Sequence, residues 1–515
     1  MRVTSHPATL TTLALLLLAI GSLGYWALQG RAHTYPDAPA GKFACLSYTP
    51  RSASSKGPTV DSRAQIDRDL LQLSKRTNCV RTYSVTNGLE YVPAAARKLG
   101  MRVLLGIWIG VNKETNEREI TQGIITANAD RDVIDAIIVG NEVLLRREQT
   151  AEVLAQMLQR VSVATHIPVT YADVWDFWLK HPKLASASDF VTIHILPYWE
   201  DEPVSIDHAM EHVSAIFKQV QQTFPGKRIY VGEVGWPSVG RQRQASNPSL
   251  LNQARFTREF IALANRLQLP YNFIEAYDQP WKKGLEGTVG GYWGLYDANG
   301  HEKFPLVGDV TADAQWWRGP LSGAIAAVLL LIVARSALGI RTASPLTQIG
   351  IAGFAFGCLG MLQWDYLWYS NRDWQEWLAM GSWALLCNVI CLSRLFDYNE
   401  RWPRMWNTLL LLLLISMTYI NLGLVFDARY RDFPTAFVLL PIALLALKGT
   451  QPARLVNSSE GLLLSTWLVL SAPVIVALEF LSNGSALLWC LLSGLLGWRI
   501  LFDHRVATRL VTTHQ

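Results

Sequence analysis

Seven long apolar segments in the second part of the chain limit its fold more than any other sequence feature. An α-helix needs about 20 predominantly apolar residues to cross the hydrocarbon core of a bilayer. All of these segments except 434–448 reach or approach that length. Residues 319–515 are therefore predicted to form an all-α polytopic transmembrane region. The predicted spans are 321–340, 346–369, 377–396, 407–427, 434–448, 460–481 and 485–502.

A further apolar run, 9–28, lies near the N-terminus with Arg2 before it and Arg31 after it. It is longer than the apolar core of most signal peptides, and no small-residue cleavage site closes it. Residues 1–31 are therefore expected to form a cytoplasmic N-terminus and an uncleaved signal-anchor helix, which brings the predicted spans to eight.

The loops between the apolar segments alternate between basic and acidic or mixed composition. Because basic loops stay in the cytoplasm, this alternation predicts that both termini are cytoplasmic and that residues 32–318 lie on the other side of the membrane. The loops expected on that other side contain Asp373, Glu376 and residues 427–432. The basic residues expected in the cytoplasm are Arg341, Arg394, Arg401, Arg404, Lys448, Arg454, Arg499, Arg505 and Arg509.

Composition separates the two parts of the chain. The whole sequence is 50% hydrophobic and only 17% charged, against roughly 25% charged residues in typical soluble domains. Residues 32–318, in contrast, have an ordinary globular composition. The net charge of +5 is small and the basic residues are scattered, which argues against nucleic acid as a partner.

The six cysteines do not form a disulfide framework. Four of them lie in the apolar segments, where they are expected to be small core residues. Cys45 and Cys79 lie in two predicted strands, and buried free thiols are the favoured interpretation. A bridge between them is the alternative if residues 32–318 are extracytoplasmic.

Strand-like and helix-like stretches alternate through residues 32–318. This order is typical of a parallel α/β fold. Eight strands with helices between them predict a closed (β/α)8 TIM barrel. The predicted strands are 43–47, 79–83, 103–107, 136–139, 169–171, 190–195, 229–231 and 272–276.

Two of these strands stop at a glycine. Gly140 is followed by Asn141 and Glu142, and Gly232 is followed by Glu233. The carboxyl ends of barrel strands carry the catalytic groups in TIM-barrel enzymes, so the two carboxylates are expected to converge on one face. Such a pair can cleave a glycosidic bond, one carboxylate as nucleophile and the other as proton donor. The alternative for Asn141 is an N-cap of a helix that runs through Leu144 and Leu145.

The stretches Val139-Gly-Asn-Glu142 and Val231-Gly-Glu-Val-Gly-Trp-Pro-Ser238 resemble the two signatures of glycoside hydrolase family 17, the β-1,3-glucanase family. The resemblance covers about residues 40 to 310. It implies a retaining reaction on a (β/α)8 barrel, with Glu142 as acid/base and Glu233 as nucleophile. This chemistry needs no metal and no other cofactor.

Other residues at the predicted strand ends could bind sugar, because aromatic faces stack on glucose rings and polar groups bond its hydroxyls. The resemblance supports Tyr198 near the nucleophile, and Glu275 with Lys282 in contact with substrate. Each residue alone is more often explained by packing than by binding. The expected substrate-binding residues are Arg81, Tyr83, Asn141, Tyr198, Trp236, Glu275, Trp281 and Lys282.

The resemblance also suggests a location and a partner. Membrane-attached bacterial members of this family are described as β-glucan synthases or transferases, so we expect a multi-pass protein of the bacterial inner membrane. Its barrel, residues 32–318, would be periplasmic and would transfer preformed β-1,3-glucan. Its partners would be the glucan, the lipid bilayer and a membrane glucan synthase. Two alternatives stay open: a β-1,3-glucanase that hydrolyses its substrate, and a glucan-binding or export protein.

Overall fold

The computed structural model describes residues 6–38, 42–51, 63–396, 403–427, 431–450, 455 and 458–512. The predicted cytoplasmic residues Arg401 and Arg454 lie outside these ranges. Contacts divide the chain into two units. One unit holds His33–Gly240 and Ala245–Val310, and the other holds Met1–Ala32, Arg241–Gln244 and Thr311–Gln515.

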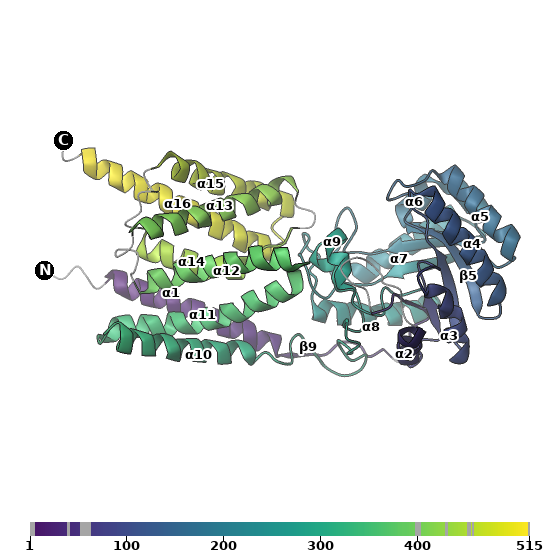
Figure 1. Ribbon diagram of the computed structural model, residues 1–515, viewed down its shortest axis with the longest axis horizontal. Helices are drawn as coiled ribbons and strands as arrows, with labels where there is room; N and C mark the ends of the chain where they lie inside the picture. Colours follow the sequence, from purple (N-terminus) through teal and green to yellow (C-terminus); the bar gives the residue numbers. More distant parts are fainter. Residues whose placement is uncertain are drawn as a thin grey trace. The chain divides into compact units, whose positions relative to one another are not determined.

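The first unit is built around a parallel sheet whose strands follow one another in chain order, as the alternating sequence pattern predicts. Helices between the strands flank this sheet (Figure 1). Among the described residues the sheet contains β2 (Leu46–Ser47), β3 (Cys79–Arg81), β4 (Arg102–Ile107), β5 (Ile134–Asn141), β6 (Val169–Val174), β7 (Val191–Ile195) and β8 (Ile229–Val234).

The predicted eighth strand, 272–276, contributes isolated bridges instead of a continuous ladder. Phe273 bridges Leu46 of β2, and Tyr271 bridges Val231 of β8. The Phe273 N–H also donates to the Cys45 carbonyl, at 2.9 Å. This segment therefore touches both edges of the seven-stranded sheet and closes the TIM-like barrel.

The helices of the first unit begin where the sequence provides capping side chains. Asn112, Thr150 and Ser249 each accept a hydrogen bond from a backbone N–H in the first turn of α4, α5 and α8. Such caps satisfy donors that the helix itself leaves free. The helices are α2 (Arg63–Leu73), α3 (Val92–Lys98), α4 (Lys113–Ala129), α5 (Ala151–Thr165), α6 (Trp175–Lys180), α7 (Ala209–Thr223) and α8 (Leu250–Leu267).

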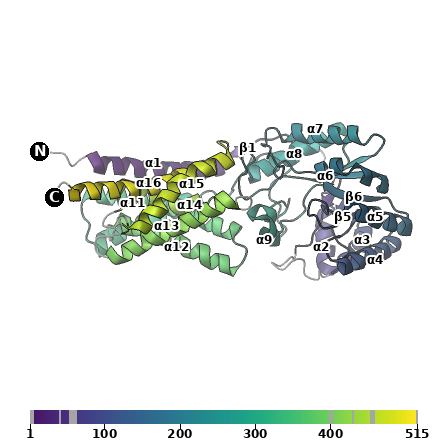
Figure 2. The same cartoon turned by 90° about the horizontal axis from the view of Figure 1, so that it is seen from above.

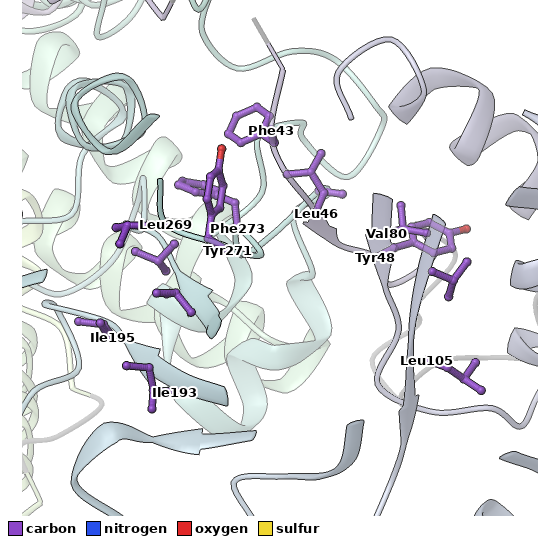
Figure 3. Close-up of a cluster of buried hydrophobic side chains, with 14 of the residues drawn as sticks. Phe43, Leu46, Tyr48, Val80, Leu105, Ile193, Ile195, Leu269, Tyr271 and Phe273 are labelled. Carbon is purple, nitrogen blue, oxygen red and sulfur yellow. The ribbon is translucent and has the colours of Figure 1, made fainter. Parts of the chain in front are cut away.

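A continuous apolar core lies beneath these helices. Side chains from the first and last parts of the barrel meet in it, among them Leu46, Val80, Ile193 and Phe273 (Figure 3). Full burial of such a side chain contributes about 1.5–3 kcal/mol to folding. Because the core joins residues from both ends of this unit, it holds the strand ends, and therefore the site, in place.

Cys45 and Cys79 form a disulfide, with their Cα atoms 4.5 Å apart. The favoured expectation of two free thiols was therefore wrong, and the alternative holds. Strand pairing explains the difference, because the parallel alignment of β2 with β3 brings the two residues to the same end of adjacent strands. The other four cysteines are free and buried.

The second unit consists of apolar helices at the predicted positions. Seven described helices are long and apolar enough to cross a membrane, while Thr435–Lys448 is shorter, in line with the sequence. Helix α15 packs against α16, and α10 against α11 (Figures 1 and 2). The helices are α1 (His6–Gln29), α10 (Arg318–Ile332), α11 (Ala343–Ser370), α12 (Trp374–Leu395), α13 (Pro403–Phe426), α14 (Thr435–Lys448), α15 (Ser459–Glu479) and α16 (Gly484–Thr512).

Candidate active site

Glu142 follows β5 directly and lies on an unusual turn. Gly140 has φ +81°, and a Cβ at this position would come within 2.8 Å of the Val143 side chain. Glu142 itself has φ 52°, and its N–H donates to the Ala172 carbonyl at 2.8 Å. Helix α5 begins only at Ala151. The alternative interpretation of Asn141 as the N-cap of a helix through Leu144 was therefore wrong, because the left-handed turn at Glu142 interrupts the chain first.

Glu233 lies within β8, three strands further along the barrel, and its side chain is only 6% exposed. The Tyr83 hydroxyl donates to Glu233 Oε1 at 2.8 Å. Arg81 Nη1 lies 3.5 Å from the same oxygen. With one oxygen engaged by these donors, the carboxylate has a defined orientation.

His194 joins the two carboxylates. It is paired with Glu233 in the β7–β8 register, and its side chain is fully buried. Its Nδ1 lies 3.0 Å from Glu142 Oε1, and its Nε2 lies 3.7 Å from Glu233 Oε1. The position of His194 at the end of a predicted strand was visible in the sequence, whereas its contact with both glutamates depends on the fold.

The environment lowers the pKa of Glu142. Burial, the largest influence, raises this pKa, but the hydrogen bond and charge of His194 together with Arg146 and Arg81 outweigh it. The net pKa lies below the ordinary 4.5. The carboxyl of Glu142 is therefore mainly ionised at neutral pH while no substrate is bound.

Charged groups of the site also act on a further carboxyl, that of Glu286. Burial raises the pKa of Glu286 to about 7, against the opposing charge of Lys282 and with help from the negative charges of Glu275 and Glu142. Glu286 ends the short helix α9 (Lys283–Glu286). Sequence reasoning missed it, because no strand end or motif marks this position.

Several residues expected to bind substrate are buried instead. Trp236 is 0% exposed, its ring lies 5.8 Å from that of Phe256, and its Nε1 donates to the Asn247 carbonyl. The Arg81 side chain is 1% exposed and donates to the Gly232 carbonyl at 2.7 Å and to Asn141 Oδ1 at 2.6 Å. Direct contact with a sugar therefore does not agree with the burial of Trp236 or of Arg81.

Four further expected residues differ in accessibility: Tyr198, Glu275, Trp281 and Lys282. Tyr198 is 1% exposed and packs against the Trp293 ring. Lys282 is partly exposed and donates to both oxygens of the buried Glu275, at 3.0 and 2.8 Å. Trp281 is half-buried and donates through Nε1 to Gln279. Among these residues, Lys282 and Trp281 have surface that a sugar could reach.

Glu142, His194 and Glu233 each present one atom of a kind that binds metals, and these atoms lie within 4.8 Å of one another. Among the described residues this is the group whose spacing would suit a metal ion. The same atoms already take part in hydrogen bonds with one another and with Tyr83. These contacts suit two carboxylates that act on a sugar directly, so we assign no metal to them.

The separation of the two glutamates defines the reaction class. One oxygen of each carboxylate lies within 4.8 Å of the other. Retaining glycoside hydrolases hold their carboxyl groups about 5–5.5 Å apart, whereas inverting enzymes need about 6.5–9.5 Å to admit water. The barrel is therefore an enzyme domain of the retaining glycoside hydrolase class.

Comparison with known proteins shows what this domain is similar to. The BtgE/BtgC glycoside hydrolase domain model matches residues 45–294. The matched stretch contains both sequence motifs, and the barrel is a glycoside hydrolase domain.

Two curated relatives are similar to this part of the chain. A glucan 1,3-beta-glucosidase of Schizosaccharomyces pombe is 28% identical over 256 residues, which cover 46% of this chain and 79% of that protein. A putative glucan endo-1,3-beta-glucosidase btgC of Aspergillus niger is 30% identical over 291 residues, covering 49% of this chain and 40% of that protein. The chain thus spans less than half of the Aspergillus protein.

A solved structure resembles the same part of the chain. The glycoside hydrolase family 17 beta-1,3-glucanosyltransferase of Rhizomucor miehei is 29% identical, with a TM-score of 0.45. The match covers 52% of this chain and 97% of that one.

Proposed function

We propose that this protein is a membrane-tethered transferase that acts on β-1,3-glucan. The observation that carries the chemistry is the approach of Glu142 and Glu233 to within 4.8 Å near the carboxyl ends of β5 and β8. The substrate class rests on the curated relatives, which are named as enzymes of 1,3-β-glucan.

In the proposed reaction Glu233 attacks the anomeric carbon of a bound glucan. The bond from this carbon to the leaving oxygen breaks, and the proton of Glu142 passes to that oxygen. The product is a glycosyl ester on Glu233. The hydroxyl of an acceptor then gives its proton to Glu142, its oxygen attacks the anomeric carbon, and Glu233 leaves as a carboxylate.

The helical unit favours a sugar over water as the acceptor. A hydrolase that degrades glucan gains little from seven helices of membrane-crossing length. A transferase that extends or branches glucan gains from staying at the membrane, because a polymer in synthesis is held there. The Cys45–Cys79 disulfide supports an extracytoplasmic barrel, since such bonds persist in oxidising compartments.

Product analysis tests this proposal. The full-length protein in detergent is incubated with one β-1,3-gluco-oligosaccharide, and the products are measured by mass spectrometry and linkage NMR. We expect products longer than the substrate, with none from the Glu233→Gln variant. Products that are only shorter would refute transfer.

Hydrolysis is the second candidate, because both curated relatives described above are named glucosidases. Water and a sugar hydroxyl compete for the same glycosyl ester, so the two activities share Glu142 and Glu233. Water labelled with ¹⁸O distinguishes hydrolysis from transfer. In H₂¹⁸O a hydrolase places ¹⁸O at the anomeric carbon of the fragment released from the glycosyl ester, whereas a transferase leaves the lengthened products unlabelled.

The pH dependence of the activity should follow from the contact between His194 and Glu142. Because Glu142 must be protonated to assist the leaving group, activity is lost as the pH rises through its pKa. His194 lowers this pKa, so His194→Phe should raise it and move the alkaline limb of the kcat/KM profile to higher pH. The rates of the unaltered protein and of His194→Phe are measured between about pH 3 and pH 8, a range that includes the ordinary pKa values of Glu, about 4.3, and His, about 6.5.

His212→Phe is the matched control for this profile, because His212 pairs with Glu200 instead of with either glutamate of the site. We expect its profile to coincide with that of the unaltered protein. An unchanged alkaline limb in His194→Phe, or an equal shift in both variants, would contradict the role of His194.

A further inference from the structure

Four side chains form a buried chain of hydrogen bonds that ends on Glu233. Asn272 Nδ2 donates to Ser47 Oγ at 2.6 Å. Ser47 Oγ lies 2.8 Å from the Tyr83 hydroxyl, which donates to Glu233 Oε1 at 2.8 Å. Ser47 and Asn272 are both 0% exposed. Neither can therefore contact a substrate in this state, and neither was expected from the sequence.

Asn272, the first residue of this series, sets the direction of every hydrogen bond in it. Asn272 Nδ2 also donates to the Gly232 carbonyl at 2.8 Å. A carbonyl oxygen only accepts, so the amide must present its NH₂ group to Gly232 and Ser47 rather than its oxygen. Ser47 accepts from this NH₂ and keeps its own proton for Tyr83. Tyr83 is then left with its proton directed at Glu233.

The backbone before the nucleophile is held by Asn272 together with Arg81. The Gly232 carbonyl accepts from Asn272 and also from Arg81 Nη1, at 2.7 Å. A Cβ at Gly232 would approach the Thr192 side chain to 2.5 Å, so only glycine allows β8 to lie this close to its neighbour. The backbone and the side chain of Glu233 are thus located by one network.

We infer that Ser47 and Asn272 are positioning residues that orient Glu233 through Tyr83. This series of hydrogen bonds, together with Arg81, engages Oε1 of Glu233. Oε2 of Glu233 is left as the oxygen that attacks the anomeric carbon. Burial raises the pKa of the Tyr83 phenol well above 10, so it keeps its proton and remains a donor. This inference rests on the proposed role of Glu233 as nucleophile.

The first test is a double-mutant cycle on kcat/KM with a β-1,3-gluco-oligosaccharide. Tyr83→Phe should lower the rate about tenfold or more, the usual effect of losing a hydrogen bond to a charged group. Ser47→Ala removes a hydrogen bond between neutral groups and should lower the rate about two- to tenfold. If Ser47 acts only through Tyr83, Ser47→Ala should have almost no additional effect in the Tyr83→Phe background. Two losses that multiply would overturn the inference.

The second test needs no substrate and is therefore independent of the proposed activity. The infrared carboxylate band of Glu233 is isolated as the difference between the full-length protein and its Glu233→Gln variant. We expect this band to shift in Ser47→Ala and in Asn272→Leu, because both variants break the chain of hydrogen bonds. A band that stays in place in both would overturn the inference, even if the glucan proved to be the wrong substrate.

Thr170→Val is the matched control for both tests. Thr170 is also a fully buried hydroxyl of a barrel strand, and it donates to the Phe190 carbonyl at 2.7 Å. It has no hydrogen bond to the chain that ends on Glu233 in the described structure. We expect an unchanged band and an unchanged rate. Equal changes in Thr170→Val and Ser47→Ala would assign the effect to general loosening of the barrel and overturn the inference.

Discussion

Glu233→Ala is expected to lower glucan cleavage and transfer by about 10⁴-fold or more, because the variant lacks the group that forms the covalent intermediate. The space vacated by the side chain lies beside Tyr83 and Arg81 and should remain intact, since both side chains keep other partners in Ser47 and Asn141. The loss is measured as the initial rate of consumption of a β-1,3-gluco-oligosaccharide.

Added azide should restore part of the activity of this variant. The small anion can occupy the position of the missing carboxylate and attack the anomeric carbon while Glu142 still protonates the leaving oxygen. The attack comes from the face opposite the leaving group, so the product is an α-glycosyl azide, which NMR identifies.

The control for the Glu233→Ala experiment is Glu117→Ala, which removes a surface carboxylate paired with Arg160. We expect its rate to match that of the unaltered protein. A Glu233→Ala variant that keeps more than about one hundredth of the original rate, well above the expected loss of a nucleophile, would exclude Glu233 from this role. A β-glycosyl azide would do the same.

The two glutamates could be predicted because their signals are local. Each comes within two residues of a glycine that closes a short apolar run, and barrel enzymes carry their catalytic groups at the carboxyl ends of such strands. Gly140 and Gly232 indeed have physical reasons to be glycine, one for its positive φ and the other for close approach to β7. Such signals need only a few consecutive residues.

The residues that hold Glu233 could not be predicted, because they come together only when the barrel closes. Asn272 and Ser47 are separated by 225 positions in the sequence, and Arg81 and Glu233 by 152. Contacts between residues so far apart in the sequence leave no periodic or motif signal. The same reason explains Trp236, which belongs to a recognisable motif but whose burial against Phe256 depends on helix α8.

The helical unit shows the opposite case, in which composition alone locates the elements. Apolar runs of membrane-crossing length predicted helices that the structure contains, including the shorter Thr435–Lys448. The Cys45–Cys79 bond was less accessible to prediction, since it depends on which strands are neighbours. Hydropathy thus locates apolar helices, while strand neighbours and side-chain networks need the folded chain.

Glu142→Ala should separate the two steps of the reaction. On β-1,3-gluco-oligosaccharides we expect a loss of about 10²–10⁴-fold, the usual contribution of general acid–base catalysis. A dinitrophenyl β-glycoside has a leaving group that needs no proton, so its first step should stay fast and the glycosyl ester on Glu233 should accumulate. A burst of released dinitrophenol, followed by slow turnover, is the expected measurement.

Azide should accelerate the second step of Glu142→Ala, because this anion attacks without a general base. It approaches the glycosyl ester from the side where Glu142 stood, so the product is a β-glycosyl azide, opposite in configuration to that expected from Glu233→Ala. The two glutamates face the same anomeric carbon from opposite sides, and only that arrangement gives opposite products from the two variants. An α-glycosyl azide from Glu142→Ala, or an equal rate loss on both kinds of substrate, would contradict the role of Glu142 as acid and base.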